Sequence, residues 1–293
     1  MMSRLRRADF RAIAMLACAA AAGIATPMPA LAAPADIATC DRLAAHPDDS
    51  DKPADVKGTL DIAGADVTAA LRACKAAAAA ADAPRRIWFE LGRAYEFNRQ
   101  PAEAAYAYRK AVNAGNTSAM VGLGVLLING VGVKTNLTEA RSLIEKAANA
   151  GDVGGMNNLA SIYGAGLGIP VNFAMARKWY ARAAEGNSSE SMFQLGLMIQ
   201  DGDGGPKDDT AAKALFEKAA ARDHAGALER LGAYAEAGRA GPKDDKAAIA
   251  FYQKGAALGS EDAAKALERL RCPFAMKDNN DKMVGRICFD GKN

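Results

Sequence analysis

Apolar residues in the middle of the chain recur at the three- and four-residue spacing of amphipathic helices. The pattern repeats every 36 residues, and each period has an apolar first half, a glycine-containing break and an alanine-rich second half. One leucine marks the same place in each first half, at Leu91, Leu123, Leu159, Leu195, Leu231 and Leu267, and the first period is four residues shorter. Each period predicts an antiparallel helix pair. The series predicts an all-α fold, a right-handed α-solenoid of about five repeats over residues 87–271.

Turn-forming residues also occupy fixed places in each period. Residues that tolerate a left-handed backbone are predicted to end the first helix, at Asn98, Gly130, Gly166, Gly202 and Gly238. Similar residues are predicted to end the second helix, at Gly115, Gly151, Asn187, Asp223 and Gly259. The second helix is predicted to begin after an N-cap, at Asn136, Asn172, Asp208 and Asp244. The stretch GPKDD, which occurs at residues 205–209 and 241–245, is therefore predicted to be a loop and a helix cap.

These features together resemble a known repeat. A Leu-Gly pair, a glycine-x-glycine loop, Pro-Lys-Asp and Lys-Ala-Ala at this period resemble Sel-one-like repeats, relatives of the tetratricopeptide repeat with a longer loop inside the hairpin. The resemblance covers about residues 87–271 and implies a scaffold that binds protein or peptide partners. Some secreted bacterial members carry a disulfide in each repeat. The repeats here have no cysteine before Cys272, so that subgroup's properties, β-lactam binding included, are not implied.

The resemblance also implies where a partner binds. In tetratricopeptide-type solenoids, the residues two before and two after the leucine point into the concave groove. The corresponding groove residues here are Phe89, Arg93, Val121, Val125, Asn157, Ser161, Phe193, Leu197, Glu229 and Ala233. Several are apolar although they lie off the seam within the hairpin, and an apolar strip in a groove is a common binding surface. The alternative is a tightly wound superhelix in which these residues only pack against their neighbours.

Residues 1–32 are predicted to be a cleaved signal peptide. They contain four arginines, a short apolar run and the small-residue motif Ala30-Leu31-Ala32. A lipoprotein signal at Cys18 and a twin-arginine signal at Arg6-Arg7 are the less favoured alternatives. Of 37 Lys+Arg and 34 Asp+Glu residues, four arginines and one aspartate lie in this segment, so 33 of each remain. A neutral chain gives no support for a nucleic-acid partner, and no later apolar run reaches transmembrane length. We expect a periplasmic or secreted protein.

Four cysteines follow the predicted signal peptide: Cys40, Cys74, Cys272 and Cys288. An even number in an exported chain predicts disulfides. Three pairings are possible, and we favour Cys40–Cys74 and Cys272–Cys288 because each pair lies near one end of the chain. Residues 33–86 are then predicted to form an N-terminal cap with a helix near Asp66–Pro84. Residues 272–293 are predicted to form a C-terminal hairpin closed by a disulfide.

The sequence contains none of the common catalytic motifs. A Gly-x-Ser-x-Gly elbow, a phosphate loop, an H-E-x-x-H helix and a CxxC zinc motif are all absent. His46 lies in a polar loop, and His224 is expected to be a surface residue in a turn. The acidic stretch at 201–209 fails the EF-hand pattern because Gly205 and Ala212 occupy ligand positions. We predict no enzymatic activity, no cofactor and no metal.

The sequence therefore predicts a non-catalytic scaffold of the bacterial envelope that binds a protein or peptide partner. Two alternatives remain open at this point. The first is a periplasmic regulator that docks on a membrane sensor kinase, and the second is a cell-wall or β-lactam hydrolase. The oligomeric state is also open, and a monomer is compatible with the sequence.

Overall fold

The computed structural model describes residues 33–271, 274–277 and 283–287. The predicted signal peptide (residues 1–32), Cys272 and Cys288 lie outside these residues. The described part of the chain forms thirteen α-helices and one two-stranded sheet. The bounds are α1 Pro34–Ala44, α2 Gly64–Ala78, α3 Arg85–Phe97, α4 Pro101–Asn113, α5 Thr117–Asn129, α6 Leu137–Asn149, α7 Val153–Ala165, α8 Phe173–Glu185, α9 Ser189–Asp201, α10 Asp209–Ala220, α11 Ala225–Ala237, α12 Asp245–Ala257, α13 Glu261–Arg271, β1 Phe274–Lys277 and β2 Met283–Ile287.

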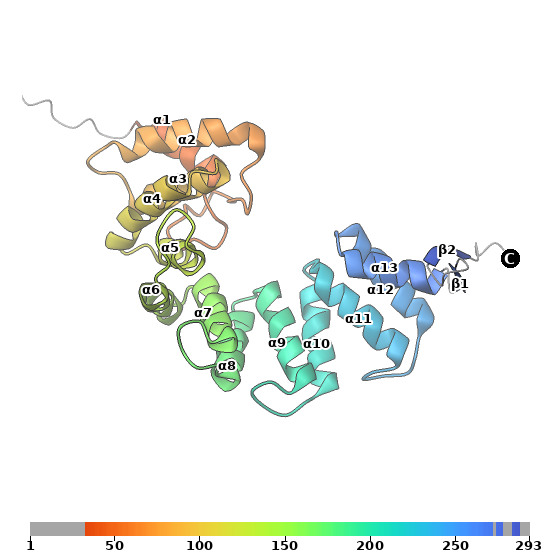
Figure 1. Cartoon of the computed structure of the whole chain (residues 1–293). Helices are drawn as coiled ribbons and strands as arrows, with labels where there is room; N and C mark the ends of the chain where they lie inside the picture. Colours follow the sequence, from red (N-terminus) through yellow and green to blue (C-terminus); the bar gives the residue numbers. More distant parts are fainter. Residues whose placement is uncertain (1–32, 272–273, 278–282, 288–293) are drawn as a thin grey trace, which may run out of the picture.

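Helices that follow one another in sequence pack together in space. The pairs α3–α4, α5–α6, α7–α8, α9–α10 and α11–α12 form hairpins, and each hairpin stacks on the next. The result is an open arch with α1 and α2 at one end and α13 at the other (Figure 1). The predicted α-solenoid is confirmed. At the C-terminal end, β1 and β2 pair antiparallel, with Phe274 opposite Ile287. The predicted hairpin therefore forms, whereas its predicted disulfide lies outside the described residues.

The glycine that follows the marker leucine brings the two helices of a hairpin close together. A Cβ atom at Gly196 would lie 2.6 Å from the ring of Phe216, and one at Gly232 would lie 2.6 Å from the ring of Tyr252. Both rings belong to the second helix of their hairpin and are buried. A small residue at this place therefore leaves room for an aromatic residue in the hairpin seam.

The predicted turns and caps are confirmed with one exception. The residues predicted to end the helices have positive φ, except Asn98, whose φ is −83°. In that shorter first hairpin the positive φ falls on Arg99 instead, because the chain must turn at once into α4. Each predicted N-cap accepts a hydrogen bond from the backbone N–H three residues later, at Asn136, Asn172, Asp208 and Asp244. The GPKDD stretches are thus loops and helix caps.

His224 was expected to be a turn residue, and the structure gives it a more specific role. Its Nδ1 accepts a hydrogen bond from the backbone N–H of Ala227 at 3.1 Å, so it is the N-cap of α11. Its Nε2 lies 3.0 Å from a carboxylate oxygen of Glu190 in the preceding repeat. An imidazole that accepts at Nδ1 carries its proton on Nε2, which can then donate to Glu190. His224 therefore links two repeats.

Ala240 is the one non-glycine residue at a repeat position that Gly132, Gly168 and Gly204 occupy in the preceding repeats. All four residues have positive φ, and that of Ala240 is 51°. A left-handed backbone costs a residue with a Cβ atom about 1–2 kcal/mol, partly offset by the greater freedom of glycine in the unfolded chain. We expect Ala240→Gly to raise the free energy of unfolding by about 0.5–1 kcal/mol. Urea denaturation followed by circular dichroism measures this, and a loss of stability would contradict it.

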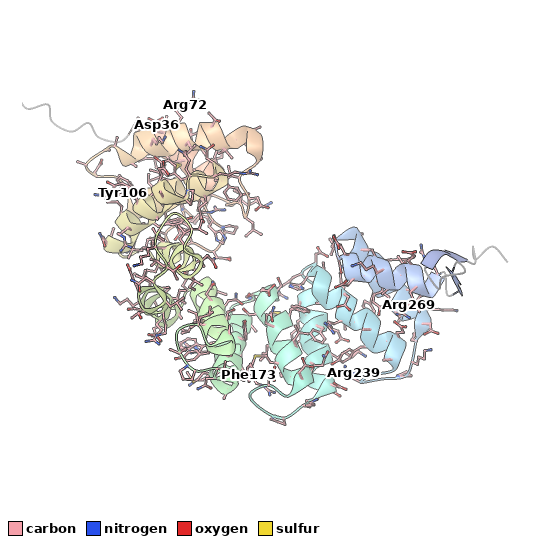
Figure 2. The ribbon with its side chains drawn as sticks, viewed as in Figure 1. Asp36, Arg72, Tyr106, Phe173, Arg239 and Arg269 are labelled. Carbon is pink, nitrogen blue, oxygen red and sulfur yellow. A yellow bond between two sulfur atoms is a disulfide. The ribbon has the colours of Figure 1, made fainter. Side chains whose placement is uncertain are left out.

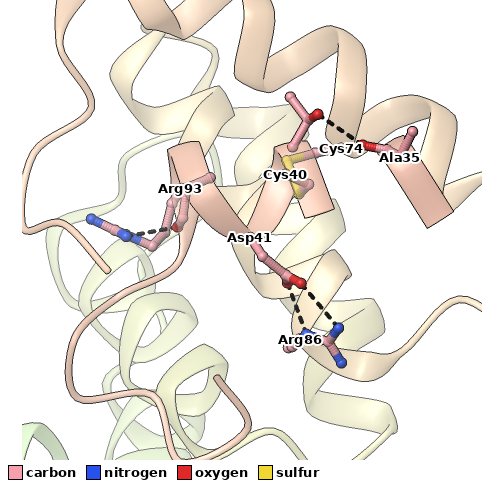
Figure 3. Close-up of a disulfide and its surroundings, with 8 residues drawn as sticks. Ala35, Cys40, Asp41, Cys74, Arg86 and Arg93 are labelled. Carbon is pink, nitrogen blue, oxygen red and sulfur yellow. Dashed lines mark hydrogen bonds and ion pairs between the residues drawn. A yellow bond between two sulfur atoms is a disulfide. The ribbon is translucent and has the colours of Figure 1, made fainter. Parts of the chain in front are cut away.

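The N-terminal cap packs on the first hairpin of the solenoid. Helices α1 and α2 contact each other and α3, and they share one hydrophobic cluster with α3. Cys40 of α1 and Cys74 of α2 form a disulfide within this cluster, and both residues are fully buried (Figure 3). The predicted Cys40–Cys74 pairing is confirmed. The predicted helix begins and ends earlier, at Gly64 and Ala78, and α1 is a second helix that the sequence interpretation did not include.

Candidate partner-binding site

Helices α5 and α7, each the first helix of its hairpin, lie on the inner side of the arch (Figure 1). Together with α9 and α11, which are also first helices, they carry most of the predicted groove residues. Eight of those residues are half-buried, namely Val121, Val125, Asn157, Ser161, Phe193, Leu197, Glu229 and Ala233. The two on α3, Phe89 and Arg93, are buried, with 5% of each residue exposed. The contacts of these residues separate them into four groups.

The two valines of α5 pack less into the protein core than the larger apolar groove residues of α3 and α9 do. Val121 and Val125 are half-buried, yet they belong to none of the hydrophobic clusters formed by the described residues. Apolar side chains that are partly open to solvent and not part of a core are available to a partner. Val121 and Val125 are therefore the strongest candidates for partner contact.

The two polar residues of α7 join neighbouring helices. Ser191 of α9 donates a hydrogen bond from Oγ to Oδ1 of Asn157 at 2.8 Å. Ser161 Oγ lies 2.8 Å from the hydroxyl oxygen of Tyr180 in α8. Asn157 thus connects two repeats, and Ser161 connects the two helices of one hairpin. Both have a structural role in the free protein.

The groove residues of α9 are packed more tightly than those of α5. Phe193 lies with its ring centroid 4.6 Å from that of His224 and 5.9 Å from that of Phe216. Leu197 also packs against the large central cluster. Replacing Phe193 by a charged residue would therefore change stability as well as any binding, so Phe193 is a poor site for a binding test.

Glu229 of α11 stands apart from the apolar residues of the predicted groove. A carboxylate oxygen of Glu229 lies 3.3 Å from Nε of its neighbour Arg230. Burial raises the pKa of Glu229. The predicted groove is thus apolar on α5 and α9 and charged on α11.

A cavity of about 380 Å³ opens where the N-terminal cap meets the solenoid. We call it the junction pocket. It lies between the α1–α2 loop, α3, α5 and the start of α7, and its walls include Leu60, Phe89, Arg93, Val121, Asp152 and Asn158. Three of these, Phe89, Arg93 and Val121, were predicted as groove residues. The loop residues were not, because they lie outside the repeats and no periodic signal places them.

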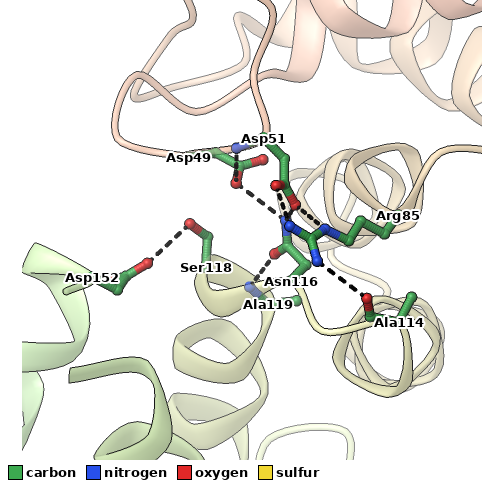
Figure 4. Close-up of polar contacts among 8 residues, drawn as sticks. All are labelled: Asp49, Asp51, Arg85, Ala114, Asn116, Ser118, Ala119 and Asp152. Carbon is green, nitrogen blue, oxygen red and sulfur yellow. Dashed lines mark hydrogen bonds and ion pairs between the residues drawn. The ribbon is translucent and has the colours of Figure 1, made fainter. Parts of the chain in front are cut away.

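Polar side chains of α3 and of the α5 N-cap hold the α1–α2 loop against the solenoid. Arg93 donates hydrogen bonds to the carbonyl oxygens of Ala44, Thr59 and Leu60 at 2.6–2.8 Å. The amide of Asn116, the buried N-cap of α5, donates to Asp49 at 3.1 Å and to Asp51 at 2.9 Å (Figure 4). Arg93 therefore stabilises the wall of the junction pocket.

The pKa values of two carboxyl groups in this loop are shifted in opposite directions. Burial raises the pKa of Asp49. Burial also acts to raise the pKa of Asp51, but hydrogen bonds from Arg85 and Asn116 outweigh it, and the pKa of Asp51 is lowered. Arg85 donates to both oxygens of Asp51 at 2.6 Å (Figure 4). Asp51 is therefore the charged residue that holds the loop to the solenoid.

The described residues contain one cluster with metal-ligand chemistry. Ligand atoms of Cys40, Cys74 and Glu90 lie within 4.8 Å of one another. The two sulfur atoms are joined in the disulfide and cannot act as thiolate ligands. This arrangement therefore does not support a metal centre. Separately, none of the described helices has the length and apolar character needed to span a membrane.

Comparison with known proteins places these helix pairs in a family. The Sel1 repeat model matches residues 117–152, 153–188, 189–224 and 225–260. The matched segments begin at the first residues of α5, α7, α9 and α11. A search of curated proteins found no match.

Two solved structures resemble most of the arch. A Sel1 repeat protein from Oxalobacter formigenes is 27% identical, with a TM-score of 0.63 over 71% of this chain and 89% of that one. The protective antigen c5321 of uropathogenic Escherichia coli, which displays an SLR fold, is 26% identical, with a TM-score of 0.61 over 73% of this chain. The match covers 45% of c5321, so this chain corresponds to less than half of that protein. With four matched repeats and these structural relatives, the chain belongs to the Sel1 repeat family.

Proposed function

We propose that this protein is a non-catalytic interaction scaffold of the bacterial envelope that binds a segment of a partner protein along the inner side of its arch. Sel1 repeat proteins are generally protein-interaction scaffolds. The observation that carries the proposal is the pair Val121 and Val125, which are half-buried apolar side chains outside every hydrophobic cluster of the described residues. Val121 also lines the junction pocket, so an apolar surface and a cavity adjoin.

The envelope location is supported by the chemistry of the cap. The Cys40–Cys74 disulfide joins α1 to α2 and is buried in their shared hydrophobic cluster. Disulfides form and persist in oxidising compartments such as the periplasm. The predicted signal peptide at residues 1–32 points to the same compartment. A membrane sensor kinase with a periplasmic domain is one partner of this kind.

The experiment compares two proteins with the same substitution at different places. Val125→Glu puts a charge among the candidate contact residues. Val171→Glu puts the same charge in the α7–α8 loop, where 53% of the valine is already exposed. Each protein captures partners from an envelope fraction after chemical crosslinking, and mass spectrometry quantifies them. Circular dichroism confirms that both variants are folded.

We expect Val125→Glu to lose the specific partner and Val171→Glu to retain it, because burying an unpaired carboxylate in an interface costs several kcal/mol. If both folded variants capture the same partner as well as the unaltered protein does, the inner side of the arch is not the binding face.

A further inference from the structure

The junction pocket has apolar walls and an open rim. Phe89 and Val121 line it, and Leu60 and Phe97 also belong to its wall. Leu60 and Phe97 are large apolar side chains that remain 66% and 38% exposed. Partly exposed apolar groups at the rim of a cavity can hold the aliphatic part of a ligand. The apolar walls thus suit the aliphatic part of a long side chain.

The charged groups of the pocket are mostly negative. Asp48, Glu96 and Asp152 line it, against one guanidinium group, that of Arg93. Burial lowers the pKa of His46, which also lines the pocket, so this imidazole is neutral at pH 7. Burial raises the pKa of Glu96. Even when Glu96 is set aside, two carboxylates face one guanidinium.

Hydrogen bonds decide which of these charges a ligand would meet. Arg93 donates three hydrogen bonds to carbonyl oxygens of the cap, so these bonds stabilise the wall of the pocket. Asp152 accepts from the backbone N–H of Gly155 and from Ser118 Oγ at 3.2 Å, which fixes its carboxylate at the start of α7 (Figure 4). Asp48 is exposed. The pocket therefore offers one held carboxylate and one accessible carboxylate beside apolar walls.

We propose that the junction pocket receives a cationic side chain, arginine or lysine, from the partner segment that lies along the inner side of the arch. The proposal rests on the proposed function and names the chemistry of the partner. The apolar walls contact the aliphatic stem, and Asp48 and Asp152 pair with the cationic head. A charge enclosed by low-dielectric walls interacts more strongly with such carboxylates than it would on an open surface.

The test uses a defined probe and the folded protein. The probe is the blocked dipeptide acetyl-Leu-Arg-amide, and its neutral counterpart contains citrulline in place of arginine. Binding is followed by NMR at the backbone amides of Gly122 and Gly154, two glycines of the pocket. The double variant Asp48→Asn/Asp152→Asn removes both charges. Asparagine is also a good N-cap, so α7 keeps its cap. The control is Asp55→Asn, an exposed aspartate of the same loop that does not line the pocket.

We expect the arginine probe to shift both amides, the citrulline probe to bind at least about tenfold more weakly, and the double variant to lose binding to the same degree. Asp55→Asn should bind as the unaltered protein does. Equal binding of the two probes, or equal binding by the double variant and the control, would overturn the proposal. So would tight binding of putrescine without binding of the arginine probe, since the ligand would then be a free polyamine.

The two proposals fail separately in these experiments. If Val125→Glu loses the partner but the arginine probe does not bind, the pocket assignment alone is wrong. If the probe binds as expected but Val125→Glu captures the partner normally, the proposed binding face alone is wrong.

Discussion

Replacing Cys40 and Cys74 together by alanine is expected to destabilise the N-terminal cap by about 3–4 kcal/mol. The disulfide joins residues 34 apart in sequence, and it limits the freedom of that loop in the unfolded chain. Both residues are fully buried in the cluster that joins α1, α2 and α3, so the substitution also removes packed sulfur atoms. The effect should be local, because a solenoid repeat contacts only its neighbours.

Hydrogen exchange measured by mass spectrometry tests this region by region. Amides of α1 and α2 should exchange much faster in the double variant, whereas those of α9 and α10 should not change. The unaltered protein with dithiothreitol is the control, because it breaks the disulfide and keeps both side chains. Unchanged protection of α1 and α2 in both samples would show that packing alone holds the cap.

Glu90→Gln is expected to stabilise the protein at pH 7 by about 3 kcal/mol. Glu90 lies in α3 beneath the cap and is fully buried, and its protonated carboxyl group can donate a hydrogen bond to the carboxylate of Asp41. Burial, and after it the negative charge of Asp41, raises the pKa of Glu90 to about 9 from 4.5. The native protein therefore keeps this carboxyl group protonated at neutral pH, whereas the unfolded chain releases the proton.

The sign of the pH dependence follows from these two states. Between pH 4.5 and about 9 the native state binds one more proton at Glu90 than the unfolded state does. The contribution of Glu90 to the free energy of unfolding is fully present below pH 4.5. It falls by about 1.4 kcal/mol per pH unit as the pH rises through this window. Glutamine is neutral in both states, so the variant lacks this slope.

Fluorescence of Trp88, which packs against the same cluster, reports unfolding of the cap. The chain has two tryptophans, so the measurement uses a Trp179→Phe background. Urea midpoints at pH 5, 6, 7 and 8 should diverge between this background protein and its Glu90→Gln variant as the pH rises. Glu185→Gln, at an exposed glutamate of α8, should run parallel to the background protein. Parallel profiles for Glu90→Gln would contradict the account.

The repeated part of the fold could be predicted because each feature recurs. One small residue such as Gly196 does not predict a helix contact by itself. Small residues at the same place in every period, beside an aromatic residue such as Phe216, do indicate where the two helices of a hairpin pack together. Asp208 and Asp244 were recognised as caps because Asn136 and Asn172 occupy the same column. Helix propensity and cap chemistry agree in each copy, and that agreement fixes the hairpins.

Interactions that occur only once could not be predicted in this way. The path of the α1–α2 loop depends on Arg93, Asn116 and Asp51, which lie far apart in sequence. The junction pocket follows from that path. Asn98 was placed by its column, but the shortened loop moved the positive φ to Arg99. The burial of Glu90 is likewise set by the cap, whose sequence does not repeat.

The most direct test of the proposed binding face is a titration of the captured partner against the Val125→Glu and Val171→Glu proteins. If the inner side of the arch binds the partner, Val125→Glu should raise the dissociation constant at least about tenfold, and Val171→Glu should leave it unchanged. Equal dissociation constants for the two folded variants would show that the partner binds elsewhere on the protein.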